Sequence, residues 1–239
     1  MSSAITDDPV VILGAARTPM GSFQGSLATL SAPQLGAVAI RAAVERAGLA
    51  SDAVGEVLMG CVLPAGVGQA PARQAALGAK LSLATGCTTI SKVCGSGMKA
   101  TMLACDLILS GSQRMVVAGG MESMSNAPYL LPKARGGLRL GHGQIIDHMF
   151  FDGLEDRYDA ATKGRLMGTF AEDCAGQFNF SRDDQDAFAT SSTLRAQQAM
   201  RDGCFDWELA PVAIESRGPE KIVAQDEGPP SARLTRSRR

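Results

Sequence analysis

The first 120 residues alternate between short apolar runs and longer segments with a helical period. Apolar runs predict buried strands over 10–14, 54–63, 88–93 and 114–120. Between them, apolar residues three or four positions apart predict helices over 32–49, 69–81 and 95–111. Strands that alternate with helices in this way form βαβ units. We therefore expect an α/β fold whose mainly parallel sheet is covered by helices on both faces.

The pattern changes after residue 121. Residues 123–143 are rich in Gly, Pro and Ser and show no period, which is typical of a long loop or an insertion. The last residues, 231–239, are basic and have no apolar period, so we expect them to be disordered. We divide the chain into an α/β core over 1–121, an inserted α-rich loop domain over 122–230, and this tail.

Two helix starts are expected within the insertion. Thr169 with Glu172, and Ser181 with Asp184, have the spacing of a capping box, in which two side chains satisfy the free N–H groups of a first turn. The second start opens a helix of about 22 residues. Residues 208–216 predict a further strand.

Composition narrows the class of protein. Apolar residues make up 45% of the 239, which is enough for a normal core. The 23 basic and 24 acidic residues nearly cancel, so charge indicates neither a nucleic-acid partner nor an anionic membrane. No run reaches the roughly 18 apolar residues of a membrane span. The first residues lack the basic start of a secretion signal, and we expect a cytoplasmic protein.

The cysteines and histidines give no sign of a metal site. Six cysteines without a secretion signal or a C-x-x-C pair are expected to be reduced thiols. The two histidines, His142 and His148, are far from any cysteine in sequence. We therefore expect no bound metal.

One cysteine has a context of its own. Cys94 lies between the predicted strand 88–93 and the predicted helix 95–111, with Gly95 and Gly97 after it. The free N–H groups and the positive end of a helix dipole favour an anion, and the thiolate is the reactive form of cysteine. The same N–H groups can stabilise an oxyanion when a carbonyl is attacked. Cys94 is thus a candidate nucleophile, with burial as a small core residue as the alternative.

A second interpretation of the same stretch is open. The sequence "GSGMKA" fits the G-x-G-x-x-A pattern of a dinucleotide site, with Glu122 after the next strand as the ribose-binding acid. Glu122 follows Gly95 by 27 residues, however, whereas this acid is expected about 20 residues on. A chain of this kind would be an NAD(P)-dependent oxidoreductase.

Several segments together resemble the thiolase family, acetyl-CoA acetyltransferases in particular. They occur in the family's order from about residue 9 to about residue 228: "VILGAARTPMGSFQGSL", "VLMGCVLPAGVGQAPARQAAL", "KVCGSGMKA", "VVAGGMESMSNAPY", "KGRLMGTFAED" and "SRDDQDAFA". The resemblance implies two similar α/β halves, the first of which carries an inserted loop domain that binds coenzyme A. It also implies that two acyl-CoA molecules are condensed, or a 3-ketoacyl-CoA is cleaved by coenzyme A, through a thioester on Cys94.

The resemblance also implies roles for other residues. Cys94 and Gly95 would supply backbone support for an oxyanion. Met167 matches a methionine along the pantetheine path, and Arg217 matches a basic residue near the nucleotide of coenzyme A. Leu166 stands where relatives that form acetoacetyl-CoA often have histidine, which leaves the chain-length preference open. Coenzyme A would be a substrate, so no cofactor is expected.

The sequence departs from the family in its second half. The second half of a thiolase has a G-H-P histidine that activates the nucleophile and a C-x-G cysteine that moves the proton of the substrate α-carbon. No G-H-P motif occurs here, and the one C-x-G string, at 174–176, lies in the expected insertion and not in a second half. We expect a thiolase N-terminal half whose C-terminal half is missing, most simply through a frameshift after Glu227. Such a chain would retain the nucleophile and lose carbon–carbon bond formation. The nucleophile, the histidine and the second cysteine act together, so the loss of two of them lowers the rate by several orders of magnitude.

Two expectations about partners follow. Helix faces and sheet edges that would pack on a second half should be exposed, which favours pairing with another chain. The chain would then form a homo-oligomer, as is common in the family, or act as a non-catalytic partner of a thiolase-like chain. In either case the small-molecule ligand would be coenzyme A or an acyl-CoA.

Overall fold

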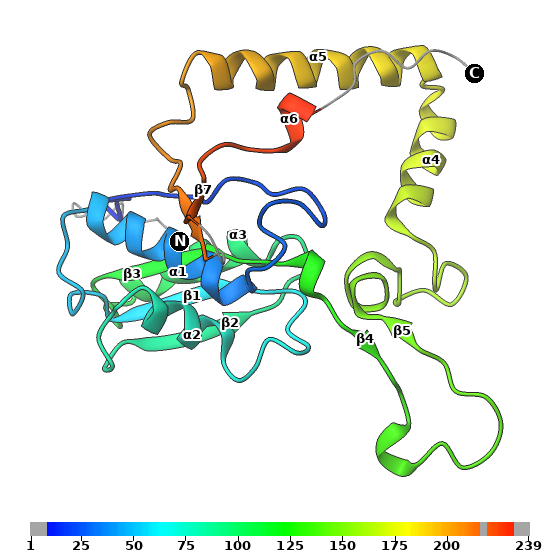
Figure 1. The fold of residues 1–239 in the computed structure, drawn as a ribbon, viewed down its shortest axis with the longest axis horizontal. Coiled ribbons are helices and arrows are strands. Elements are labelled where there is room, and N and C mark those ends of the chain that lie inside the picture. The colour runs from blue at the N-terminus through cyan, green and yellow to red at the C-terminus, as the bar shows by residue number, and fades with distance from the viewer. Residues whose placement is uncertain (1–8, 216–218, 232–239) are drawn as a thin grey trace, which may run out of the picture.

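The computed structural model describes residues 9–215 and 219–231. Its centre is a parallel three-stranded sheet in the order β2-β1-β3, with β1 Glu56–Gly60, β2 Gly86–Ile90 and β3 Val116–Gly120 (Figure 1). Three helices accompany it: α1 Ala32–Arg46, α2 Pro71–Gly78 and α3 Ser96–Leu109. The predicted α/β order of these six elements is confirmed, with bounds shifted by a few residues.

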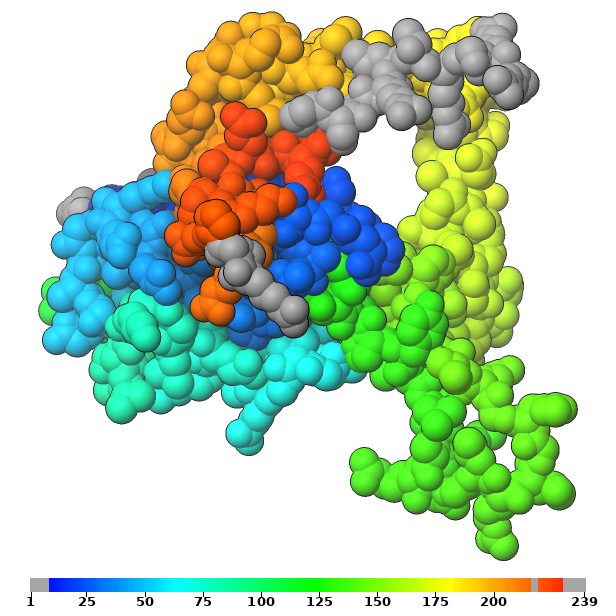
Figure 2. Space-filling model, viewed as in Figure 1, coloured from blue at the N-terminus to red at the C-terminus, as the bar shows by residue number. Residues whose placement is uncertain are grey.

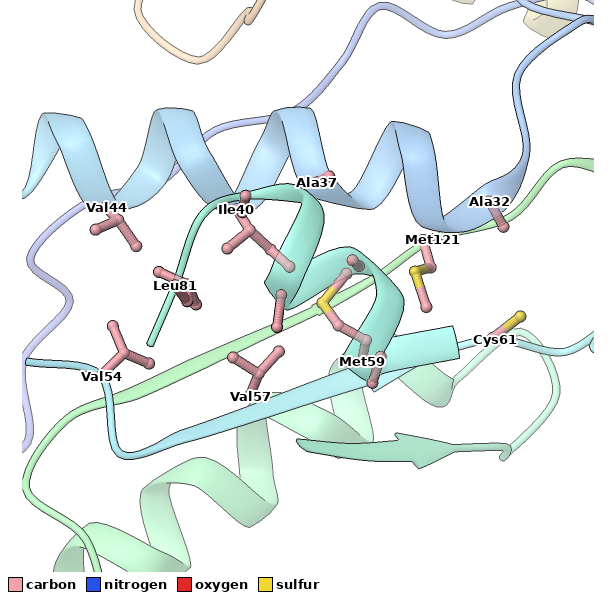
Figure 3. Packing of buried hydrophobic residues seen from close by; sticks show 14 residues of the cluster. Ala32, Ala37, Ile40, Val44, Val54, Val57, Met59, Cys61, Leu81 and Met121 are labelled. Atoms are coloured by element: carbon pink, nitrogen blue, oxygen red, sulfur yellow. The ribbon is translucent and has the colours of Figure 1, made fainter. Parts of the chain in front are cut away.

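The central strand shows why the sheet needs helices on both faces. Successive side chains of a strand point to opposite faces. Val57 and Met59 of β1 belong to the main core with residues of α1 and α2 (Figure 3). Leu58 packs on the other face with Ala100 and Ala104 of α3. All three β1 side chains are almost fully buried. The continuous apolar run "VLM" is therefore a strand buried on both sides, as in other parallel sheets.

The first helix begins where its sequence signals it. Ser31 is the N-cap of α1 and forms a capping box with Gln34, and Pro33 lies in the first turn, where proline costs no hydrogen bond. The helix ends at Arg46, and Gly48 follows with a φ of 66°, a left-handed conformation that glycine adopts without strain. The helix predicted over 32–49 is thus found, with its end three residues earlier.

The predicted strand over 10–14 is wrong. Residues 9–16 have no strand conformation, and the side chains of Val11, Ile12 and Leu13 are 62%, 84% and 52% exposed. A strand exists only through hydrogen bonds to a neighbouring strand. Among the described residues, the sheet has no strand that pairs with this segment.

The region after β3 is largely irregular, as its lack of period predicts. It contains η1 Met124–Asn126, a short antiparallel pair of β4 Tyr129–Leu130 with β5 Ile146–Asp147, η2 Ala134–Gly136 and the π-helix η3 Met149–Leu154. The long connection between β4 and β5 projects from the molecule as the green arm in Figure 2. Within this region β4 contacts β5, and β5 contacts η3.

Two long helices follow, α4 Met167–Phe178 and α5 Arg182–Arg201. The predicted capping box of Ser181 with Asp184 is confirmed at the start of α5. The predicted start at Thr169 is wrong, because α4 begins at Met167 and the Thr169 hydroxyl donates back to the Leu166 carbonyl (2.8 Å). A threonine inside a helix often bonds to the preceding turn in this way.

The chain then returns to its N-terminal region. The hairpin of β6 Val212–Ile214 and β7 Lys221–Val223 buries Val212 and Val223 against Leu27, and α6 Gly228–Ser231 follows. The strand predicted over 208–216 is therefore found in shorter form. The division of the chain at residues 121 and 122 stays a prediction, and the tail 232–239 lies outside the described residues.

Charged groups hold this return in place. Arg17 donates to Asp226 (2.7 and 3.0 Å) and to Glu208 (2.6 Å), and Asp226 is buried. The Glu227 carboxylate accepts the N–H groups of Ser22 (2.6 Å) and Ser26 (2.9 Å). We call these contacts between the segment 17–26 and the acids at 208, 226 and 227 the terminal clasp. The clasp gives the otherwise irregular residues after Arg17 fixed partners.

Candidate active site

The carboxyl ends of the three parallel strands lie at one edge of the sheet, where the chain places chemically active side chains. Cys61 directly follows β1, Cys94 follows β2 by four residues, and Glu122 follows β3 by two. In Figure 1 this edge faces the side on which η1, η3 and α4 lie. Ligands of α/β proteins bind at such an edge, because the loops there are free to diverge.

Cys94 is exposed at the top of a tight turn. Strand β2 was predicted to reach residue 93, but it ends at Ile90, and residues 92–96 form the turn into α3. Gly95 N–H donates to the Lys92 carbonyl, and Ser96 N–H donates to the Val93 carbonyl (both 3.1 Å). The predicted position of Cys94 between a strand and a helix N-terminus is thus confirmed, and its burial as a core residue is excluded.

Glycines let α3 approach the sheet edge closely. A side chain at Gly60 would come within 2.7 Å of the Ser96 Cβ and 2.8 Å of the Gly97 nitrogen. A side chain at Gly120 would come within 3.5 Å of the Gly97 Cα. The first turn of α3 therefore lies directly over the ends of β1 and β3, and this fixes the height of Cys94 above the sheet.

Glu122 clamps the loop after β1. Its carboxylate accepts the N–H groups of Val62 (2.7 Å) and Leu63 (3.2 Å), and the Cys61 thiol lies 3.8 Å from it. Burial and the negative charge of Glu122 raise the pKa of Cys61 to about 11. A buried thiol of this kind stays protonated at neutral pH and is inert. This edge of the sheet thus holds an exposed cysteine, Cys94, and a buried, unreactive one, Cys61.

The same clamp argues against a dinucleotide site. A ribose-binding acid must leave its carboxylate free for the two ribose hydroxyls. Both carboxylate oxygens of Glu122 are instead engaged by backbone N–H groups of the β1 loop.

Both ring nitrogens of His148 have partners other than Cys94. Its ring is buried, Ala65 N–H donates to Nε2 (3.3 Å), and Nδ1 lies 2.5 Å from the Asp152 carboxylate. The imidazole therefore links η3 to the loop after β1. His142 lies in the exposed arm between β4 and β5. Among the described residues, no group of three or more His, Cys, Asp or Glu side chains could hold a metal ion.

Comparison with known proteins decides the family. The model of the thiolase N-terminal domain matches residues 10–235. The chain belongs to the thiolase family. It is 50% identical over 222 residues to an acetyl-CoA acetyltransferase of Schizosaccharomyces pombe, which covers 92% of this chain and 55% of the relative. An acetyl-CoA acetyltransferase of Cupriavidus necator is 50% identical over 214 residues, 90% of this chain and 53% of the relative. The chain thus spans about half the length of the relatives it matches.

The substrate-binding residues expected from thiolases lie on a separate element. Leu166 is the N-cap of α4 and Met167 its first residue, and both are partly exposed. Among the described residues, no hydrogen bond or hydrophobic cluster joins them to the Cys94 turn, and Figure 1 shows α4 standing apart from the sheet. Arg217 lies outside the described residues. The role of all three in binding coenzyme A stays a prediction.

The expected oxyanion support is partly occupied in this thiolase chain. Gly95 N–H is engaged by the Lys92 carbonyl within the turn. The backbone role of Cys94 and Gly95 therefore stays a prediction that would require this hydrogen bond to be shared or broken.

The sequence analysis missed Ser96, which fixes the turn, and considered Glu122 only as a ribose-binding acid. No spacing rule connects Glu122 to Val62, which is 60 residues away in the sequence. The available signal for Ser96 was a small polar residue between two glycines directly after the candidate nucleophile.

Proposed function

We propose that this chain is the nucleophile-bearing half of an acyl-CoA C-acyltransferase and that Cys94 carries the acyl group as a thioester. One observation supports it above the others: an exposed cysteine stands at the N-terminus of α3 and at the carboxyl edge of a parallel sheet. The relatives that share half of these residues by identity are acetyl-CoA acetyltransferases. The substrate class that follows is an acyl-CoA, with coenzyme A as a substrate and not a resident cofactor.

The proposed step is an acyl transfer between two sulfur atoms. The Cys94 thiolate attacks the acyl carbonyl of the thioester and forms a new S–C bond. The bond between that carbonyl carbon and the coenzyme A sulfur breaks, and coenzyme A leaves as a thiolate that takes up a proton. The negative charge on the carbonyl oxygen during attack is stabilised by N–H groups at the helix N-terminus.

The later carbon–carbon step is not proposed for this chain by itself. It requires the G-H-P histidine, which this sequence does not contain, and the second cysteine of the family's C-terminal half. Condensation to acetoacetyl-CoA, or the reverse cleavage in fatty acid metabolism, therefore belongs to a complete site. Leu166, Met167 and Arg217 are proposed to contact the coenzyme A part of the substrate.

Intact-mass spectrometry tests the acyl transfer. We expect incubation of the purified chain with acetyl-CoA to add one acetyl group, which peptide mapping assigns to Cys94. The adduct should vanish in Cys94→Ser and persist in Cys174→Ser, since Cys174 is another exposed cysteine of the chain. A folded chain that gains no acetyl group would show that the proposed transfer is absent.

A specific observation favours a second function, a non-catalytic partner of a thiolase-like chain. The α3 side chains Met98, Met102 and Leu109 are 73%, 54% and 59% exposed, an apolar face that no described element covers. Size-exclusion chromatography with a full-length relative tests it. Elution in the larger species supports the partner role, and separate elution of the two chains removes it.

The compartment and the oligomeric state are also proposals. Within the described part of the chain all six cysteines are free, which suits a reducing compartment such as the cytoplasm. No described helix is long and apolar enough to cross a membrane. Some relatives are mitochondrial by name, as in Xenopus laevis, so fractionation of the source cells is the measurement that decides.

A further inference from the structure

The residue before the nucleophile has an unfavourable backbone conformation. Val93 has a φ of 47°, in the left-handed region that glycine prefers. A β-branched residue is rarely found there, because its Cβ crowds the backbone. Such strain persists only where surrounding contacts impose it, and it often lies at a functional site. The contacts that impose it can be identified here.

Ser96 supplies two of these contacts through one atom. Its hydroxyl donates to the Val93 carbonyl (2.6 Å) and accepts the Lys92 N–H (2.7 Å). Both partners lie on the two residues directly before Cys94. The hydroxyl therefore ties the first residue of α3 back to the entry of the turn, and Cys94 lies between the two tied ends.

The surroundings of Ser96 leave no room for a larger side chain at this position. Its side chain is only 4% exposed, and the end of β1 lies against it at Gly60, which has no side chain. A larger residue at position 96 would meet β1, and alanine would leave the Lys92 N–H without its partner. A buried serine whose hydroxyl spans two backbone groups is specified by both its size and its hydrogen bonds.

We propose that Ser96 is a positioning residue, whose hydroxyl holds Val93 in the left-handed conformation and thereby keeps Cys94 at the N-terminus of α3. This inference rests on the proposed function of Cys94. It adds a second side chain to the site, one that acts on the thiol through the backbone and does not touch the substrate.

The reactivity of Cys94 in Ser96→Ala tests the proposal. The rate of carboxamidomethylation by iodoacetamide is followed from pH 6 to 9 by mass spectrometry of the Cys94 peptide. We expect a rate at pH 7 that is about twofold to fivefold lower than in the unaltered chain, the size of a helix N-terminus effect on an anion. The pH profile should move to higher pH. Ser110→Ala is the matched control, because Ser110 is the exposed C-cap serine of the same helix.

A double variant separates positioning from general stability. Glycine tolerates a positive φ, so Val93→Gly combined with Ser96→Ala should restore most of the rate and the original pH profile. An unchanged profile in folded Ser96→Ala would overturn the proposal. If Ser96→Ala does not fold and the double variant does not restore folding, the hydroxyl serves the fold and the proposal is again overturned. Iodoacetamide contains no coenzyme A, so this result is independent of the acetylation experiment.

Discussion

At the scale of single residues, burial separates two cysteines that lie at the same edge of the sheet. Cys61 is 1% exposed and faces the Glu122 carboxylate, whereas Cys94 is exposed on its turn. Burial is the first reason that the pKa of Cys61 rises to about 11, and the charge of Glu122 adds to it. Two thiols that follow neighbouring strands are therefore assigned opposite reactivity.

Thiol labelling checks this assignment. In the folded chain at pH 8 we expect iodoacetamide to modify Cys94 within minutes and to leave Cys61 unmodified, because only about one in a thousand Cys61 side chains is a thiolate at that pH. Quantitative peptide mass spectrometry gives the two fractions. Unfolding in urea is the control and should make both thiols react. Modification of Cys61 in the folded chain would contradict its assigned environment.

Gly60 provides a prediction about space at the site. An alanine there would press on the Ser96 Cβ and the Gly97 backbone, which has no freedom to move away. We expect Gly60→Ala to lower the free energy of unfolding by about 1–3 kcal/mol, as for other overpacked positions. The matched control is Gly176→Ala in α4, where no atom lies in the way and alanine should stabilise the helix by about 0.5–1 kcal/mol. Urea denaturation measures both.

At the scale of elements, local patterns predicted most helices and strands correctly. Capping at Ser31 and Ser181 depends on neighbours within three residues, so the sequence alone reveals it. The strand predicted over 10–14 is wrong because a strand depends on a partner strand. The helix start predicted at Thr169 is wrong because its hydroxyl donates to the Leu166 carbonyl instead of capping a first turn. The position of Cys94 between a strand and the next helix followed from the βαβ pattern. The Glu122 clamp did not, because it joins residues far apart in sequence.

The terminal clasp makes the stability of its elements depend on pH. Burial by itself raises the pKa of Asp226, but the hydrogen bonds from Arg17 and from the Met20 N–H outweigh it, and the net pKa lies below its usual value. Hydrogen bonds from Ser26 and Ser22 lower the pKa of Glu227 as well. A carboxyl whose pKa is lowered by folding stabilises the fold above its unfolded pKa, and this stabilisation is lost as the pH falls through the folded pKa.

We therefore expect the urea midpoint to be nearly constant from pH 7 to about pH 5 and to fall below about pH 4, the region of unfolded carboxyl pKa values. Asp226→Asn should lower the unfolding free energy at pH 7 by about 2–3 kcal/mol, since it removes the negative charge paired with Arg17 and replaces one of the two acceptor oxygens by an amide donor. It should also reduce the decline in acid. Asp186→Asn, which removes an exposed i,i+4 pair with Arg182, should change stability by only about 0.3–0.5 kcal/mol. A decline in acid that is the same in Asp226→Asn and the unaltered chain would disprove this role of the clasp.

At the scale of the whole molecule, large apolar side chains lie on the surface in several places. They include Met98, Met102 and Leu109 on α3 and the unpaired Val11, Ile12 and Leu13 near the N-terminus. Exposed apolar surface of this kind marks an interaction site or a tendency to aggregate. The chain spans only about half the length of the relatives it matches, and we expect this surface to associate with a partner.

Light scattering after size-exclusion chromatography tests whether the chain associates through this surface. We expect the chain to associate more as its concentration rises, and Met98→Glu combined with Met102→Glu should shift it toward the monomer. The matched control, Ser110→Glu with Ser112→Glu, adds the same charge at exposed polar positions of the same helix end and the turn after it, and should leave association unchanged. Equal association of the two double variants would contradict a role for the α3 face.

The terminal clasp also sets an order of events during synthesis. Arg17 and Asp226 are 209 residues apart, so the segment after Arg17 emerges from the ribosome long before its acidic partners exist. At roughly 5–20 residues per second, the delay is about 10–40 s. During that time β1, β2 and β3 can already form their sheet, whereas the segment after Arg17 still lacks its acidic partners. Newly made chains are therefore most open to chaperones and proteases at their beginning, until the acids at 208, 226 and 227 have been made.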